Sequence, residues 1–152
     1  MPGYKGHLVG GVAIYGLGLY ALQSYNPTYA TMAEWLLFAL AGSLFPDIDI
    51  KSKGQKVFYR VVLLVFGILL IKGHFQLFIL ISVLSVVPMI VRHRGLFHKL
   101  WFVILFPGLV TLVLSAYFPA YATILLYDAA FFIAGAVSHL WLDVGLRRML
   151  RF

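Results

Sequence analysis

Long apolar runs separated by short polar stretches dominate the chain. Each run is close to the roughly 20 residues that a membrane-spanning helix needs. The breaks between the runs contain Pro, Gly, Asn or Lys, which are typical of turns between helices. The pattern therefore predicts an all-α integral membrane protein, a bundle of about six transmembrane helices over residues 6–22, 32–45, 57–71, 75–91, 100–118 and 121–142.

The composition supports this prediction. Of the 152 residues, 62% are hydrophobic and only 11% are charged, whereas soluble domains carry about 25% charged residues. The length predicts a single transmembrane helical domain over residues 1–152. The chain has no cysteine, so disulfides and thiolate metal ligands are excluded.

The basic residues predict the orientation. With the N-terminus in the cytoplasm, eleven of the twelve Lys and Arg residues fall on the cytoplasmic side and only Lys72 falls outside. This positive-inside bias predicts a multi-pass protein of the inner (cytoplasmic) membrane with both termini in the cytoplasm. The net charge of +7 then reports orientation, and we expect membrane lipid rather than nucleic acid as partner. A basic loop is interpreted as a contact with anionic lipid; it contains Lys51, Lys53, Lys56 and Arg60.

Tryptophans and a lone carboxylate add two expectations. Trp101 and Trp141 fall near the predicted cytoplasmic boundary and Trp35 near the opposite one, as interfacial anchors do. Asp128 falls about 12 Å into the last predicted helix. A carboxylate at that depth needs a partner, and we interpret Asp128 as a protonated or hydrogen-bonded structural residue.

A polar, histidine-bearing turn over residues 91–99 joins the fourth and fifth apolar runs. Its two histidines, His93 and His98, are five residues apart, which on a continuous helix would separate them by about 140°. Gly95 can take unusual backbone angles and so lets both rings face one point. The turn therefore predicts half of a metal site.

The remaining metal-type side chains fall at the same cytoplasmic edge. Pro46 is predicted to end the second helix, and in an extended stretch after it Asp47 and Asp49 would point the same way. His139 and Asp143 are i,i+4 and share a helix face. The full set of expected metal ligands is His7, Asp47, Asp49, His93, His98, His139 and Asp143.

This donor set indicates the kind of metal. Imidazole and carboxylate ligands suit Zn²⁺, Mn²⁺ or Fe, and we favour Zn or Mn. Three aspartates make a site with one divalent ion anionic, whereas two ions make it slightly cationic and able to attract a phosphate. Two divalent ions would activate a water and clamp a phosphoryl group. Arg94 is the candidate for a bidentate phosphate contact, and an aspartate, for which we take Asp49, is the candidate general base.

These motifs resemble a known family. Residues 46–49 (Pro-Asp-Ile-Asp), residues 93–98 (His-Arg-Gly-Leu-Phe-His) and Ser138-His139 with Asp143, preceded by His7, occur in the order found in small inner-membrane proteins. That family consists of membrane-bound predicted metal-dependent hydrolases, some of them LexA-regulated. The resemblance covers nearly the whole chain, from His7 to Asp143, and implies a bacterial or archaeal multi-helix membrane protein with these His and Asp residues as metal ligands.

The sequence thus predicts a membrane-embedded, metal-dependent hydrolase. Its site at the membrane boundary favours an amphiphilic phosphoester, such as a phospholipid or a lipid-linked substrate. One alternative is a metal-ion or proton transporter or channel, although transport sites usually lie near the bilayer midplane. Another is a non-catalytic subunit whose metal ties helix ends together. Neither the substrate nor the oligomeric state follows from the sequence.

Overall fold

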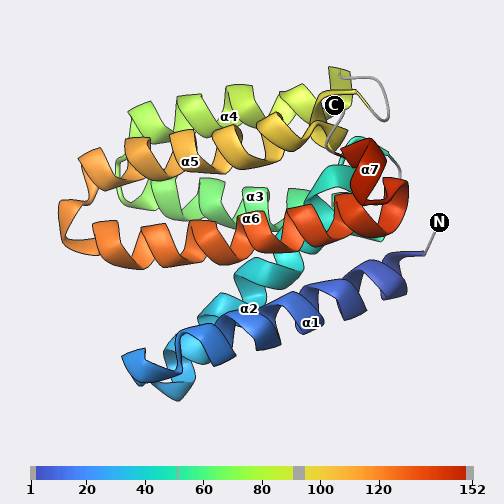
Figure 1. Ribbon diagram of the computed structural model, residues 1–152. Coiled ribbons are helices and arrows are strands. Elements are labelled where there is room, and N and C mark those ends of the chain that lie inside the picture. The colour runs from blue at the N-terminus through green and yellow to red at the C-terminus, as the bar shows by residue number, and fades with distance from the viewer. Residues whose placement is uncertain (1–2, 51, 91–94, 150–152) are drawn as a thin grey trace.

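The computed structural model describes residues 3–50, 52–90 and 95–149, and over these residues it is helical throughout, without a strand. The prediction of an all-α protein is confirmed. In chain order the helices are α1 (Tyr4–Ala21), α2 (Tyr29–Leu44), α3 (Lys53–Ile71), α4 (Phe75–Ile90), α5 (Leu100–Tyr117), α6 (Ala122–Val144) and the short α7 (Leu146–Met149) (Figure 1). Four 3₁₀ turns lie between them, η1 (Gln23–Tyr25), η2 (Phe45–Asp47), η3 (Leu96–His98) and η4 (Pro119–Tyr121).

Two helices begin at the residue types that favour helix starts. The hydroxyl of Thr28 accepts a hydrogen bond from the backbone N–H of Thr31 at the start of α2, and the hydroxyl of Ser52 accepts one from Gln55 at the start of α3. Each satisfies a backbone donor that the helix itself leaves unpaired. α6 ends at Gly145, whose φ of 75° favours glycine.

Among the described residues, three segments are long and apolar enough to cross a membrane, namely α3, α5 and the segment Pro119–Val144, which contains α6; α4 is apolar but shorter. Only 17% of the α3 span and 11% of the α5 span are buried inside the protein, so most of their apolar surface is left for lipid. The six-span topology with both termini in the cytoplasm stays a prediction.

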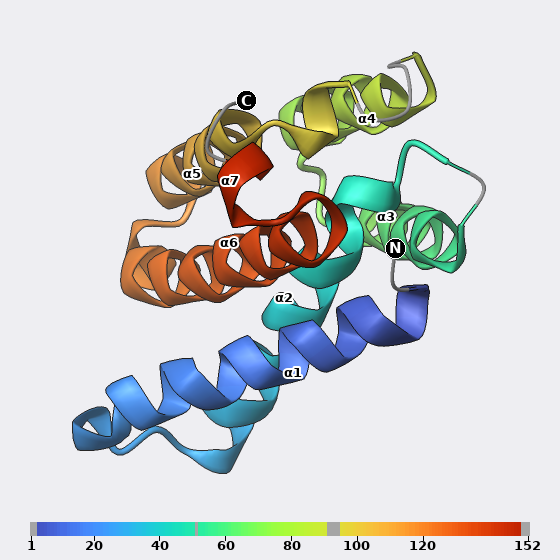
Figure 2. The same cartoon turned by 45° about the vertical axis from the view of Figure 1, so that its right-hand side comes forward.

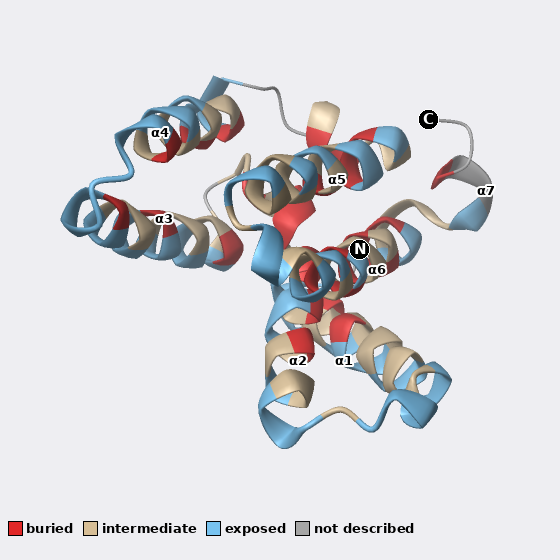
Figure 3. Ribbon diagram, turned by 90° about the vertical axis from the view of Figure 1, so that its left-hand side faces the viewer, coloured by how far each residue is buried: buried red, intermediate tan, exposed pale blue. Residues whose placement is uncertain are grey.

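α6 is the central helix. It packs against α2 most extensively and also against α1 and α5, whereas α3 packs mainly against α4 (Figure 3).

Two apolar clusters lie along α6. One contains Phe45, Ile48, Phe97, Phe102, Val103, Ala136, Leu140 and Met149. The other contains Trp35, Ala39 and Phe131. Trp35 is only 1% exposed and is therefore a core residue. The prediction that it anchors at the membrane interface is wrong.

Glycines bring α2 and α6 unusually close together. A Cβ on Gly42 would collide with the backbone carbonyl of Phe132, and a Cβ on Gly135 would collide with the carbonyl of Ala39. Small residues allow helix backbones to approach in this way in membrane proteins. The close approach holds the end of α2 firmly against the last three turns of α6.

Candidate metal centre

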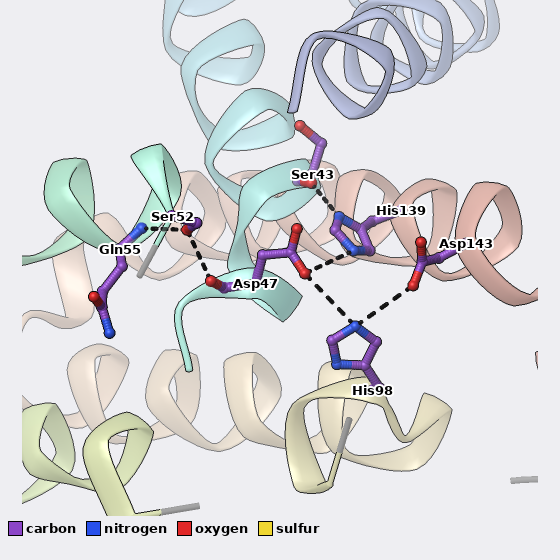
Figure 4. A network of polar contacts seen from close by, with 7 residues as sticks. All are labelled: Ser43, Asp47, Ser52, Gln55, His98, His139 and Asp143. Carbon is purple, nitrogen blue, oxygen red and sulfur yellow. Dashed lines mark hydrogen bonds and ion pairs between the residues drawn. The ribbon is translucent and has the colours of Figure 1, made fainter. Parts of the chain in front are cut away.

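Five of the predicted ligands come together at one end of the molecule, the end where the labels N and C lie in Figure 1. They come from four elements, α1, η2, η3 and α6. Figure 4 shows Asp47, His98, His139 and Asp143 pointing toward one another. The five are His7, Asp47, His98, His139 and Asp143. His93 and Arg94 lie outside the described residues.

Three of the candidate ligands, Asp47, His98 and His139, are each next in sequence to a buried apolar residue. Ile48 follows Asp47, Phe97 precedes His98 and Leu140 follows His139, and none of these neighbours is more than 2% exposed. All three belong to one apolar cluster. Burying such side chains contributes about 1.5–3 kcal/mol each, so the same packing that stabilises the fold fixes the backbone on which the ligands stand.

The His139 ring is oriented by a backbone group. Its Nδ1 lies 2.7 Å from the carbonyl oxygen of Ser43, and because a carbonyl can only accept, Nδ1 must donate. In the neutral ring the lone pair is then on Nε2, which is buried and has no hydrogen-bond partner among the described residues. A hydrogen bond from the second ring nitrogen is what fixes the tautomer of metal-binding histidines.

The distances between the ligand atoms suit a metal ion. Oδ1 of Asp47 lies 3.6 Å from Nε2 of His139 and 3.7 Å from Nε2 of His98, and the latter atom lies 3.8 Å from Oδ2 of Asp143. These separations are too long for hydrogen bonds. Ligands bound at about 2.0–2.2 Å in a tetrahedron lie roughly 3.3–3.6 Å apart, so the donors need to move only slightly to hold an ion.

The ligand atoms form two overlapping groups. In one, ligand atoms of His7, Asp47 and His139 lie within 4.8 Å of one another, and in the other those of His98, His139 and Asp143 do. Asp47 also faces His98. The two groups are therefore adjacent, with Asp47 and His139 between them.

Two imidazoles from different helices stack at the centre. The rings of His7 and His139 are stacked, with centroids 3.7 Å apart and planes at 15°. An imidazole lone pair lies in the plane of its ring, so the two rings direct their lone pairs along two planes that are close to parallel.

The charge states suit metal binding. Burial raises the pKa of the Asp47 carboxyl, but His139 and the other two imidazoles around it outweigh burial and hold that pKa below its ordinary value. Burial, together with His139, lowers the pKa of His98 below its ordinary value despite three nearby carboxylates. At neutral pH Asp47 is thus an anion and His98 a neutral imidazole, the forms that bind metals.

The prediction that Asp47 and Asp49 lie in an extended stretch is wrong. Pro46 is accommodated inside η2, and Ile48 keeps helical angles of φ −73° and ψ −15°. The chain continues in tight turns because Pro is well tolerated in a first helical turn. Asp49 is in neither group of ligand atoms, although its carboxylate, like those of Asp47 and Asp143, opposes the lowering of the His98 pKa.

Comparison with known proteins places the chain in a family. The family described as YdjM inner membrane protein matches residues 1–148. The chain belongs to the YdjM family. Searches of curated proteins and of solved structures give no match. Membership agrees with the predicted inner-membrane location and with the apolar helices.

Two residues of this YdjM-family protein that the sequence reasoning missed clamp the loop carrying the aspartates. The Ser52 hydroxyl donates to the backbone oxygen of Asp47 at 2.9 Å, and the Gln55 amide donates to that of Ile48 at 3.0 Å (Figure 4 shows the Ser52 contact). The pattern Ser-x-x-Gln at residues 52–55 is a helix-start signal that could have pointed to them. No sequence signal could have identified the Ser43 carbonyl as the partner of His139, because every residue has a backbone carbonyl.

Replacing Ser52 with alanine should weaken both the helix start and the metal site. Loss of the cap should lower stability by about 1 kcal/mol, and loss of the bond to Asp47 should weaken metal binding about 10-fold. Thr28→Ala is the matched control, since it removes a cap at the start of α2. Thermal unfolding and zinc titration in detergent check this. Equal metal affinity in the two variants would show that the Ser52 contact does not support the site.

Proposed function

We propose that this protein is an inner-membrane, metal-dependent hydrolase that holds two divalent ions, Zn²⁺ or Mn²⁺ being favoured, and acts on a phosphoester. The observation that carries the proposal is the position of the Asp47 carboxylate, which faces imidazoles from α1, η3 and α6. Two of these imidazoles, those of His98 and His139, lie 3.7 and 3.6 Å from Oδ1 of Asp47, too far for hydrogen bonds. Three imidazoles and a carboxylate form a donor set that suits transition metals.

The residues divide naturally between two ions. Because Nδ1 of His139 is held by Ser43, its ring has one free nitrogen and can serve one ion only. A carboxylate has two oxygens and can serve two. We therefore assign His7 to one ion, assign His98, His139 and Asp143 to the other, and make Asp47 the ligand that both share.

The charge balance favours an anionic substrate. Asp47, Asp49 and Asp143 supply three negative charges, and two divalent ions leave the centre with a slight positive charge. When bound, such a pair of ions supplies activation of a water and neutralisation of a phosphoryl group. Asp49 remains the candidate general base, and Arg94 remains the candidate phosphate contact.

One side of the centre is open. The Asp47 side chain is 25% exposed, against 8% for Asp143, 5% for His98 and 0% for His139. Water and substrate can therefore approach on the Asp47 side. We propose that the centre lies at the cytoplasmic edge of the membrane. A phospholipid or lipid-linked phosphoester could then present its polar group there while its chains stay among the exposed apolar faces.

The packing inside the bundle favours a hydrolase over a transporter. Asp128 lies eleven residues before His139 on α6, about 16 Å away at helical rise. The stretch between them is filled by the stacked rings of Trp35 and Phe131, 4.8 Å apart, and by the close contact of Gly135 with Ala39. These buried apolar groups separate the centre from Asp128.

Chelator dependence of hydrolysis tests the proposed function. Purified protein in detergent, loaded with Zn²⁺ or Mn²⁺, is assayed for phosphate release from p-nitrophenyl phosphate and from dihexanoyl phosphatidic acid. We expect release that a chelator lowers at least 100-fold, that added metal restores, and that Asp128→Asn leaves unchanged. Metal-loaded protein that releases no phosphate from any phosphoester, or metal flux into liposomes that Asp128→Asn abolishes, would contradict the proposal.

A further inference from the structure

Asp128 is a buried carboxylate that the proposed metal centre does not use. The residue is only 4% exposed, and its Oδ1 atom is buried without a hydrogen-bond partner among the described residues. It lies on α6, within a segment that is long and apolar enough to cross a membrane. Because an unpaired charge is strongly unfavourable in such surroundings, this carboxylate requires a positive charge to neutralise it.

The neighbouring helices offer no basic side chain for this role. α6 packs chiefly against α1, α2 and α5. The sequence contains no Lys or Arg over residues 6–50 or 100–146, and these two ranges contain the whole of α2, α5 and α6. In α1 the one basic residue is Lys5, which lies in the first turn, two residues before His7 of the metal centre. The neutralising charge must therefore come from a bound cation.

A second carboxylate, that of Glu34, comes from the neighbouring turn of α2. The ring of Trp35 lies 5.5 Å from the ring of Tyr127 and is stacked on that of Phe131 at 4.8 Å. This turn of α2 thus lies against the turn of α6 that carries Asp128, and Figure 2 shows α2 beside α6. Glu34 precedes Trp35, is half-buried, and acts on Asp128 through its charge. Two neighbouring carboxylates attract a cation more strongly than one.

We infer that Asp128 and Glu34 form a site for one small monovalent cation, whose source is a proton or Na⁺. One positive charge is enough to neutralise the buried carboxylate. Asp128 belongs to neither group of metal-type side chains, so a transition metal finds too few ligands here. The bound cation links α2 to α6 at a place separate from the metal centre, and the inference does not rest on that centre.

Infrared spectroscopy of the full chain in detergent tests this inference. Only five side chains are acidic, so the carbonyl band of a protonated carboxyl can be assigned with single variants. With choline in place of Na⁺ at neutral pH, we expect this band in the wild type and its loss in Asp128→Asn. Asp143→Asn is the matched control, because it removes a carboxylate from the same helix at the metal centre, and it should keep the band.

The contribution of Glu34 is tested in the same way. Glu34→Gln should hold the cation at least about tenfold more weakly, because the variant removes a neighbouring negative charge. For a proton, the weaker binding appears as loss of the band at a lower pH than in the wild type. For Na⁺, it appears as a need for more NaCl to reach the same rise in unfolding temperature.

The outcomes distinguish the two cations. A band that NaCl leaves unchanged identifies the proton. An unfolding temperature that NaCl raises above its value in choline chloride, in the wild type but not in Asp128→Asn, identifies Na⁺. If the wild type and Asp128→Asn agree both in the band and in the response to NaCl, the site is overturned. A Glu34→Gln variant that holds the cation as tightly as the wild type overturns the shared site as well.

Discussion

Replacing Gly135 with alanine is expected to lower the stability of the protein by about 3 kcal/mol and to release bound metal. The new Cβ would collide with the backbone carbonyl of Ala39 and lie 2.9 Å from the backbone nitrogen of Ser43. Backbone atoms inside a helix cannot swing away as a side chain can, so α2 must move off α6. That movement displaces the Ser43 carbonyl, which orients His139.

Gly67→Ala is the matched control for Gly135→Ala. Gly67 lies within α3, and a Cβ there meets no atom within 4 Å. Alanine favours helix over glycine by about 0.8–1.0 kcal/mol, so Gly67→Ala should be neutral or stabilising. Thermal unfolding in detergent and metal content of the purified variants check both. Similar stability and metal content in the two variants would show that the contact between α2 and α6 does not hold the centre together.

Most of the helical architecture could be predicted from the sequence. The apolar runs ended at Pro, Gly and Lys, and these ends lie close to the observed helix boundaries. Length and composition are local properties, so a local pattern can reveal them. The burial of Trp35 could not be predicted in this way, because it depends on stacking with Phe131 from α6, a contact between segments far apart in the sequence.

The candidate ligands could be predicted as residue types but not as an arrangement. The polar groups stood out because the surrounding sequence is apolar, and five of them lie together as expected. The local path around Asp47 was predicted wrongly, because Pro46 can begin a helical turn as well as end one. The stacking of His7 on His139 and the hydrogen bond that His139 donates to the Ser43 carbonyl required the packed structure.

Replacing Asp47 with alanine is expected to remove both of the proposed ions. Asp47 faces His7 and His139 in one group of ligand atoms and His98 in the other. Its loss should lower metal affinity at both positions by at least about 100-fold, because even groups outside the ligand shell contribute 10–100-fold. His7→Ala, which touches one group only, should lose one ion. Asp128→Asn, which removes a carboxylate far from the centre, is the control and should lose no bound metal.

The metal content of the purified protein, measured by plasma mass spectrometry after reconstitution with Zn²⁺ or Mn²⁺, tests the central claim most directly. We predict close to two equivalents in the wild type and in Asp128→Asn, one in His7→Ala, and none in Asp47→Ala. No bound metal in the wild type with either ion would contradict the claim, and so would an Asp47→Ala variant that keeps both equivalents.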